Sequence, residues 1–149
     1  MTVATQIKQG LEDVTVDEVM HHGVLACPPE APLRTVARMM TRFAIHAVVV
    51  QTVEADADEA VGIWGVVSDE DLIRAAARGD IEGRSAGGTA RTPLVTVYPH
   101  EPLKRAAELM DDQAVTHALV VSPGSGLPLG IVSSLDVARA ISAEPPRPA

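Results

Sequence analysis

Two short motifs place an aspartate three residues after a serine. They are Ser68 with Asp71 and Ser133 with Asp136. A serine that begins a helix lies beside free backbone N–H groups and the positive end of the helix dipole, where an anion is favoured. The same spacing also forms a plain capping box, which would recur if both helices simply start in the same way. Glutamate completes such a box better than aspartate does, which favours the binding interpretation over pure capping.

An arginine follows each aspartate by three residues. Arg74 and Arg139 therefore fall one turn further along the same helix face. A long cationic side chain at this place could reach the phosphates of a ligand. The arginines could equally pair with neighbouring carboxylates on an exposed face, where such pairs contribute little stability.

Other reactive side chains form no recognisable catalytic or metal-binding set. The sequence contains no Gly-x-Ser-x-Gly elbow, no Gly-x-x-x-x-Gly-Lys phosphate loop and no Gly-x-Gly-x-x-Gly fingerprint. His21 and His22 are adjacent, unlike the His-x-x-x-His pairs of helical metal sites, and Cys27 falls in an extended segment. The acidic segment 56–59 lacks the central glycine of a calcium loop and is typical of a solvated hairpin loop. We expect neither a catalytic residue nor a metal ligand.

Both serine–aspartate motifs occupy the same place in an internal repeat. The stretch from Cys27 to Val50 aligns with Val97 to Val120 at a constant offset of 70 residues. The offset then falls to 65, where Gly65 to Asp71 aligns with Gly130 to Asp136. The missing residues belong to the loop between two predicted strands. A sequence that repeats at this period is built from two copies of one structural unit.

The first copy has alternating helix and strand patterns. Thr15-x-x-Glu18 has the spacing of a capping box and predicts a short helix that ends near Met20. Apolar residues at Leu33, Val36, Ala37 and Met40 have the spacing of a helix face that begins after Pro32. The remaining predicted elements are an extended segment at 24–27, strands at 46–53 and 61–67, and a closing helix at 69–79 that Ser68 caps.

The second copy repeats this order with one weakness at its start. Its predicted strands are 116–122 and 129–132, and its closing helix is 134–142 with Ser133 as the cap. The opening helix would fall on residues 85–90, which include Gly87 and Gly88. Two glycines cost about 2 kcal/mol of helix propensity relative to alanines. We therefore expect this opening helix to be missing.

Composition limits the class of protein. The chain has 149 residues, of which 46% are hydrophobic, and Phe43, Trp64 and Tyr98 are its only aromatic residues. Two halves of about 65 residues would bury too little surface alone, so we expect them to pack together around aliphatic side chains. A net charge of −8 and a pI near 5.0 oppose nucleic-acid binding. No signal peptide or apolar run of membrane-spanning length is visible, which predicts a soluble cytoplasmic protein without membrane contact.

These motifs together resemble the cystathionine-β-synthase-type (CBS) repeat. The resemblance rests on Val19-Met20, a Pro-x-x-Pro-Leu helix start, the strand 45–50 and the closing Gly-h-h-Ser-x-x-Asp motif, where h is apolar. A tandem of such repeats resembles a Bateman module. The resemblance implies an α/β (α+β) fold with two pseudo-symmetric repeats, each a small three-stranded sheet packed on helices. The expected boundaries are an N-terminal segment 1–14, repeat 1 at 15–80, a linker 81–90, repeat 2 at 91–143 and a flexible tail 144–149.

The resemblance also implies a regulatory ligand and no required cofactor. In this family the aspartate accepts both ribose hydroxyls, the serine reaches the first phosphate, and strand backbone groups hold the adenine edge. The ligand would be AMP, ADP, ATP, NAD or S-adenosylmethionine, bound in the clefts between the repeats. The ligand-binding residues carried over to this sequence are Gly23, Leu25, His46, Ala47, Ser68, Asp71, Arg74, Pro93, Val95, Thr116, His117, Ser133, Asp136 and Arg139.

One departure from the family pattern leaves the ligand open. The family often has proline before the final valines of the strand, but this chain has Val49 and Leu119. We expect a homodimer that acts on an unidentified protein partner in trans, and we expect no enzymatic activity. The alternative is a ligand-independent homodimeric interaction module, whose apolar helix faces pair two chains. Those faces would include Met39, Met40, Leu109 and Met110.

Overall fold

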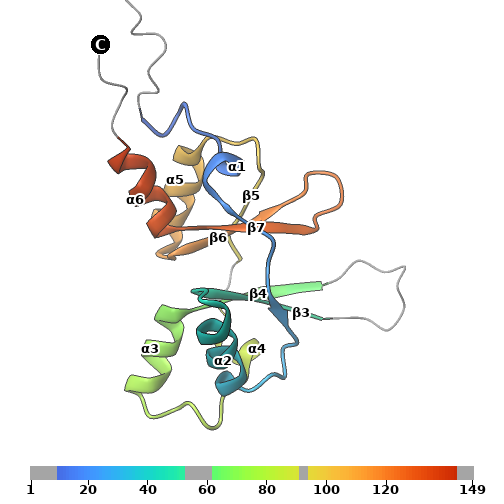
Figure 1. Ribbon diagram of the computed structural model, residues 1–149. Helices are drawn as coiled ribbons and strands as arrows, with labels where there is room; N and C mark the ends of the chain where they lie inside the picture. Colours follow the sequence, from blue (N-terminus) through green and yellow to red (C-terminus); the bar gives the residue numbers. More distant parts are fainter. Residues whose placement is uncertain (1–9, 53–61, 91–93, 144–149) are drawn as a thin grey trace, which may run out of the picture. The chain divides into compact units, whose positions relative to one another are not determined.

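The computed structural model describes residues 10–52, 62–90 and 94–143 of the chain (Figure 1). The chain divides into two compact units. The middle unit contains Val24–Leu94, and the terminal unit joins Met1–Gly23 with Val95–Ala149. The acidic segment 56–59, Pro93 and the predicted tail 144–149 lie outside the described residues.

The middle unit is a three-stranded sheet with helices on one face (Figure 1). Its strand order is β2-β3-β4, with β2 parallel to β3 and β3 antiparallel to β4. The pairing places Ala47, the first residue of β3, opposite Ser68, the last residue of β4. The elements in chain order are β2 (Ala26–Cys27), α2 (Leu33–Phe43), β3 (Ala47–Thr52), β4 (Gly62–Ser68), α3 (Asp69–Ala77) and α4 (Ala86–Thr89).

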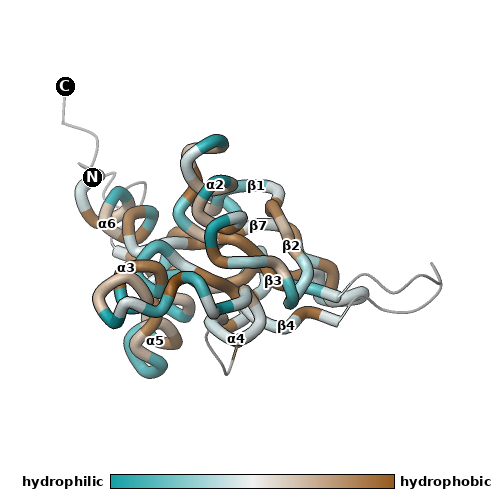
Figure 2. The backbone as a smooth tube through the Cα atoms, turned by 90° about the horizontal axis from the view of Figure 1, so that it is seen from below, coloured by the Kyte–Doolittle hydropathy of each residue, from teal (hydrophilic) through white to brown (hydrophobic). Residues whose placement is uncertain are grey.

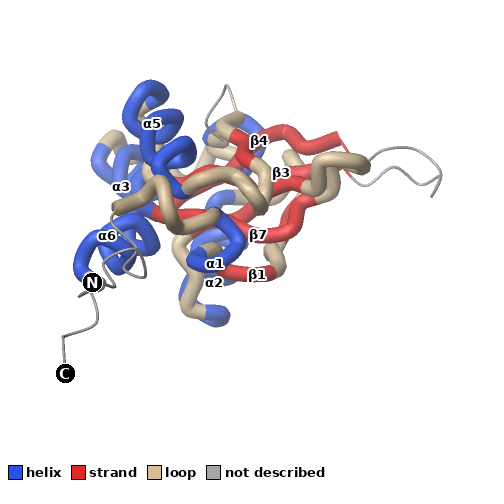
Figure 3. The backbone as a smooth tube through the Cα atoms, turned by 90° about the horizontal axis from the view of Figure 1, so that it is seen from above, coloured by secondary structure: helices blue, strands red, loops and turns tan. Residues whose placement is uncertain are grey.

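The terminal unit has the same plan with one more strand. Its strand order is β1-β7-β6-β5. Strand β1 runs antiparallel beside β7 (Figure 3). The pairing places His21 opposite Ile131. The elements in chain order are α1 (Val16–Val19), β1 (His21–His22), β5 (Thr96–Val97), α5 (Leu103–Gln113), β6 (His117–Val121), β7 (Pro128–Ser133) and α6 (Ser134–Ser142).

Each unit has its own aliphatic core. Helix α2 alternates between apolar and polar segments along its length, as the amphipathic pattern predicts (Figure 2). Met40 and Met110 are buried in these cores, so the expectation that they face a second chain is wrong. Among the core residues are Leu33, Val36, Val48, Val50 and Val67 in the middle unit, and Val16, Val97, Leu103, Val120 and Val132 in the terminal unit.

The opening helix of the second repeat is present, which corrects the expectation that its glycines abolish it. Helix α4 forms because Ser85 caps it, with the Ser85 hydroxyl accepting from the Gly88 N–H at 3.1 Å. The Gly87 N–H donates to the Pro29 carbonyl at 2.7 Å, and the Gly87 carbonyl accepts from the Trp64 indole at 3.0 Å. These contacts with distant residues offset the low helix propensity.

The first opening helix, α1, is held differently from its prediction. Thr15 makes no side-chain cap to the helix, so the predicted capping box is wrong. Its hydroxyl instead donates to Asp17 Oδ1 at 2.5 Å. The N–H groups of Val16 and Asp17 donate to the carbonyls of Glu101 and Pro99, both at 2.9 Å. The start of the helix is therefore satisfied by the backbone before α5.

The compact units do not follow the sequence repeats in order. Helix α1 and strand β1, which open the first repeat, pack in the terminal unit, whereas α4 belongs to the middle unit. Strand β1 was not predicted, and it makes the terminal sheet four-stranded instead of three-stranded. Among the residues that the structure describes, no helix is long and apolar enough to cross a membrane.

Candidate functional site

The first serine–aspartate motif lies where β4 ends and α3 begins. Ser68 is the N-cap, and its hydroxyl accepts from the Asp71 N–H at 3.3 Å. Asp71 Oδ2 in return accepts from the Ser68 N–H at 2.8 Å and from the Ser68 hydroxyl at 3.0 Å. Both residues are buried, Ser68 at 7% exposed and Asp71 at 4%. The motif is a complete reciprocal capping box.

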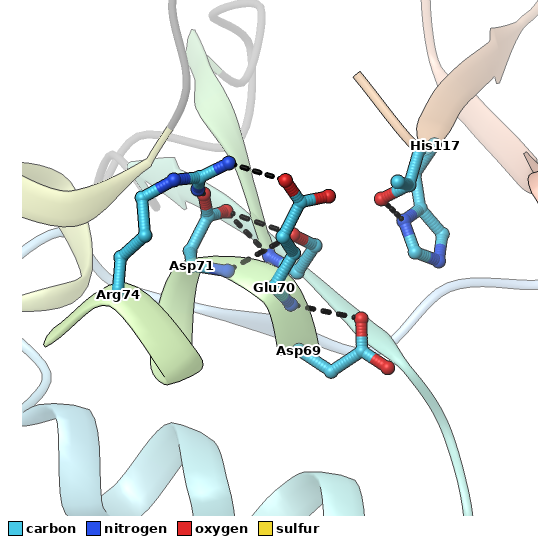
Figure 4. Close-up of polar contacts among 7 residues, drawn as sticks. Asp69, Glu70, Asp71, Arg74 and His117 are labelled. Carbon is cyan, nitrogen blue, oxygen red and sulfur yellow. Dashed lines mark hydrogen bonds and ion pairs between the residues drawn. The ribbon is translucent and has the colours of Figure 1, made fainter. Parts of the chain in front are cut away.

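The arginine of this motif is bound by carboxylates (Figure 4). Arg74 donates to Asp71 Oδ1 at 2.9 Å and forms a second short pair with Glu70 Oε1. Asp71 therefore has both carboxylate oxygens in use, one for the cap and one for the arginine. The Arg74 side chain is 37% exposed and lies at the rim of the site.

The second motif repeats this geometry where β7 ends and α6 begins. Asp136 Oδ2 accepts from the Ser133 N–H at 2.8 Å and from its hydroxyl at 3.0 Å, and the Ser133 hydroxyl accepts from the Asp136 N–H at 3.2 Å. Asp136 is 2% exposed. Arg139 is 63% exposed, and its nearest nitrogen lies 3.7 Å from Asp136 Oδ1. This arginine is held more loosely than its counterpart in α3.

His21 joins the second motif and was not among the predicted site residues. Its Nδ1 lies 3.3 Å from Asp136 Oδ2, in a contact between β1 and α6 that joins residues 115 positions apart. The adjacent histidines lack the spacing of a metal motif, and nothing in the local sequence pattern indicates this partner. Among the described residues, no three His, Cys, Asp or Glu side chains form a group that could hold a metal ion.

The strand positions of the middle unit surround the start of α3. The Leu25 carbonyl accepts from the Val49 N–H at 2.9 Å, and the His46 carbonyl accepts from the Asp69 N–H at 2.9 Å. The His46 ring nitrogen Nδ1 lies 3.1 Å from Asp69 Oδ2. Ala47 pairs with Ser68, so the predicted site residues of this unit gather at one end of its sheet. They are Leu25, His46, Ala47, Ser68, Asp71 and Arg74.

The equivalent positions of the terminal unit surround the start of α6. The Val95 carbonyl accepts from the Leu119 N–H, and the Thr116 carbonyl accepts from the Ser134 N–H, both at 2.9 Å. His117 pairs with Ser133 across the sheet, and its Nδ1 lies 2.8 Å from the Thr116 hydroxyl (Figure 4). The two motifs thus have matching backbone surroundings.

Gly23, one of the site residues predicted from the first repeat, lies in the terminal unit with the residues of the second motif. Gly23 was expected beside Leu25, but the chain passes from the terminal unit to the middle unit between these two residues. Gly23 donates its N–H to the Leu129 carbonyl of β7 at 2.7 Å, and its φ of 81° suits glycine. Pro93, its counterpart in the second repeat, is outside the described residues.

Comparisons with known proteins find CBS domains along most of the chain. The family model "CBS domain" matches residues 16–78 and again 86–143. The CBS domain-containing protein CBSX3, mitochondrial, of Arabidopsis thaliana is 27% identical over 148 residues, which cover 90% of this chain and 68% of the relative.

Two solved structures share the fold. The CBS domain pair of protein MJ0100, solved in complex with 5′-methylthioadenosine and S-adenosyl-L-methionine, has a TM-score of 0.70 at 16% identity, with 86% of this chain and 95% of that chain covered. An uncharacterized conserved protein from Pyrococcus horikoshii has a TM-score of 0.72 at 19% identity, with 95% and 100% covered. The expected fold of two CBS repeats is confirmed.

Proposed function

Because the chain belongs to the CBS domain family, we propose that it is a regulatory module that binds an adenine nucleotide or an adenosyl compound. Binding would change the conformation that the module presents to a protein partner in trans, which requires different ligand affinity in the two states. The module needs no cofactor and performs no catalysis in this account.

The observation that carries this proposal is the duplicated buried aspartate. Asp71 and Asp136 lie at the N-termini of nine-residue helices, almost fully buried, each with an arginine one turn further on. The N–H groups of such a helix start and a nearby guanidinium favour a phosphate, and a carboxylate accepts hydrogen bonds from ribose hydroxyls. A ligand would exchange the Asp71–Arg74 hydrogen bond for contacts of its own. The adenosyl ligands of the MJ0100 domain pair support this chemistry.

Thermal unfolding against a panel of compounds tests the proposal. The purified protein, freed of co-purified ligand, is heated with AMP, ADP, ATP, NAD or S-adenosylmethionine. A ligand at a hundred times its dissociation constant adds about 2.7 kcal/mol to the free energy of unfolding, which raises the midpoint temperature measurably. We expect a shift for at least one compound, and we expect Asp71→Ala or Asp136→Ala to remove it.

The control is Asp80→Ala, because Asp80 follows α3, is 44% exposed and pairs with Arg84 instead of contacting the capping box. This variant should keep the ligand-induced shift. If no compound shifts the unfolding of the wild-type protein, or if a double variant that carries both Asp71→Ala and Asp136→Ala keeps the shift, the serine–aspartate motifs are helix caps and the proposal is wrong.

A ligand-independent homodimer is the second candidate function, and exposed apolar side chains favour it. Ile73 of α3 is 68% exposed, and Leu135 and Ile141 of α6 are 49% and 69% exposed. Beside α6, an open apolar groove of about 360 Å³ lies between α5 and α6 and is lined by Ala114, Val115 and Val137 among others. A second copy of the chain would cover these helix faces, since its own helices present the same apolar residues.

Light scattering coupled to size-exclusion chromatography measures whether the protein is a dimer in solution. The wild-type protein should elute with twice the chain mass of 15.6 kDa, and Ile141→Lys should shift it toward the monomer. Leu127→Lys is the matched control, because Leu127 is 51% exposed in the turn between β6 and β7, outside the helix face. A monomeric wild-type protein would exclude this candidate.

A further inference from the structure

The two serine–aspartate sites have matching backbone surroundings but different local charge. The first turn of α3 contains the acids Asp69, Glu70 and Asp71, whereas the first turn of α6 contains only Asp136. In the alignment of the repeats, Leu135 takes the place of Glu70, and Ser134 takes the place of Asp69. The difference falls on residues within one turn of each buried aspartate.

Glu70 makes the ion pairing of Arg74 different from that of Arg139. Arg74 forms ion pairs with two carboxylates, those of Asp71 and Glu70. Its side chain is 37% exposed. Arg139 has no glutamate at the corresponding place, lies 3.7 Å from Asp136 Oδ1 and is 63% exposed. An incoming anion would meet an available guanidinium at α6 but would have to displace a carboxylate at α3.

The histidine contacts also differ between the two sites. At α3, His46 contacts Asp69, an exposed acid, and does not contact the buried Asp71. At α6, His21 contacts the buried Asp136 itself. With neutral histidines, three carboxylates accompany one arginine at α3, whereas one carboxylate accompanies one arginine at α6. The α3 site is thus more negative by two charges.

We propose that the Asp136 site takes a phosphorylated adenine nucleoside, whereas the Asp71 site takes an uncharged or cationic adenosyl compound. This inference rests on the proposed function, because it assigns ligand classes to the same two sites. A phosphate monoester carries about −1.5 to −2 charges near pH 7, which Arg139 attracts at α6 and Glu70 and Asp69 repel at α3. A thioether is indifferent to this charge and a sulfonium is attracted by it.

The test uses two ligands that share the nucleoside. AMP carries a phosphate at the 5′ position, and 5′-methylthioadenosine carries an uncharged methylthio group there. Titration calorimetry is performed on Asp71→Ala, in which only the Asp136 site is intact, and on Asp136→Ala, in which only the Asp71 site is intact. We expect the first variant to prefer AMP, with an affinity that falls as salt rises, and the second to prefer 5′-methylthioadenosine.

Exchanging Glu70 and Leu135, one of the two pairs of residues that differ, should shift the preference of each site toward that of the other. Leu135→Glu in the Asp71→Ala background should weaken AMP about tenfold and leave 5′-methylthioadenosine within about twofold, because one added carboxylate opposes a nearly doubly charged phosphate. Glu70→Leu in the Asp136→Ala background should strengthen AMP by a similar factor. Leu135→Gln is the matched control of the same size without charge, and it should leave AMP binding unchanged. Leu135 and Glu70 are both partly exposed, so the substitutions are compatible with folding.

The outcomes separate this inference from the proposed function. If both single-site variants bind these ligands with the same preference, or if Leu135→Glu and Leu135→Gln weaken AMP equally, the charge assignment is wrong while the ligand-binding function stands. If neither the wild-type protein nor either variant binds any adenosyl compound, the proposed function fails and this inference fails with it.

Discussion

At the residue scale, two alanines hold a backbone conformation that normally suits glycine. Ala44 and Ala114 end α2 and α5 in the left-handed region, with φ of 52° and 53°. An L-residue with a Cβ atom is strained there by about 1–2 kcal/mol. The strain occurs at the same place in both repeats, just before the strand that leads to each candidate site.

Replacing either alanine by glycine should therefore stabilise the protein. We expect Ala44→Gly and Ala114→Gly each to raise the free energy of unfolding by about 1 kcal/mol, measured by chemical denaturation. Ala37→Gly and Ala107→Gly, inside the same two helices, are the controls and should lower it by about 1 kcal/mol. A loss of stability in the first pair would show that the left-handed caps are not strained.

The one cysteine should be unreactive in the folded protein. Burial, with a further contribution from the charge of Glu30, raises the pKa of the Cys27 thiol above its ordinary value of 9.0. Since the thiolate is the reactive form, alkylation by iodoacetamide at pH 8 should be far slower in the native protein than in the denatured protein. The raised pKa also means that stability should fall as the pH rises above about 9, because only the unfolded chain ionises readily there. Equal alkylation rates in the two states would contradict this account.

The candidate site could be predicted from sequence where its residues are local. Ser68 and Asp71 are three residues apart, so helix-start chemistry places them together whatever the rest of the chain does. The contact of His21 with Asp136 spans 115 residues and depends on the pairing of β1 with β7, which two exposed histidines do not indicate. The placement of Gly23 in the terminal unit was missed for the same reason.

At the element scale, the long and strongly patterned helices and strands were predicted, as were the short elements α1 and β2, but β1 and α4 were not. The apolar face of α2, the β-branched residues of β3 and the cap of α6 are local signals, and each element lies within a few residues of its predicted bounds. Helix α4 contains two glycines and forms through Pro29 and Trp64, which are far away in sequence. Tertiary contacts thus override helix propensity in this element.

Gly87 should resist substitution although alanine is the better helix former. A Cβ atom at Gly87 would lie 2.8 Å from Pro29 Cβ and 3.1 Å from the Pro29 carbonyl oxygen. We expect Gly87→Ala to lower the free energy of unfolding by about 1–3 kcal/mol, because α4 must move away from Pro29. Gly83→Ala is the control, since a Cβ atom there meets nothing within 4 Å. A neutral Gly87→Ala would mean that the contact with Pro29 is not needed for α4.

At the scale of the whole molecule, the helix that opens each repeat packs in the unit formed by the rest of the other repeat. Helix α1 lies in the terminal unit and α4 in the middle unit. The sequence repeat predicts two similar halves but does not say which half each opening helix joins. Val16 is fully buried in the core of the terminal unit, together with residues from β5, α5 and β7. The N-terminal residues therefore stabilise a sheet that lies about a hundred residues later in the sequence.

Deleting residues 1–23 should affect the two units unequally. The deletion removes Val16 from the terminal core and β1 from the edge of its sheet, but it removes no member of the middle core. We expect hydrogen exchange to accelerate in β6, β7 and α6 while β3 and β4 keep most of their protection. Equal loss of protection in both units would contradict this division of the chain.

The central claim is that Asp71 and Asp136 bind a ligand as well as cap a helix, and glutamate separates the two roles. Glutamate completes a capping box at least as well as aspartate, but its extra methylene moves the carboxylate away from the position that ribose hydroxyls would need. Titration calorimetry with AMP and the adenosyl compounds should be performed on the wild-type protein and on the Asp71→Glu, Asp136→Glu double variant. We predict wild-type binding that weakens at least about tenfold in a double variant whose unfolding midpoint without ligand stays near the wild-type value. Unchanged affinity in the double variant, or no binding by the wild-type protein, would contradict the claim.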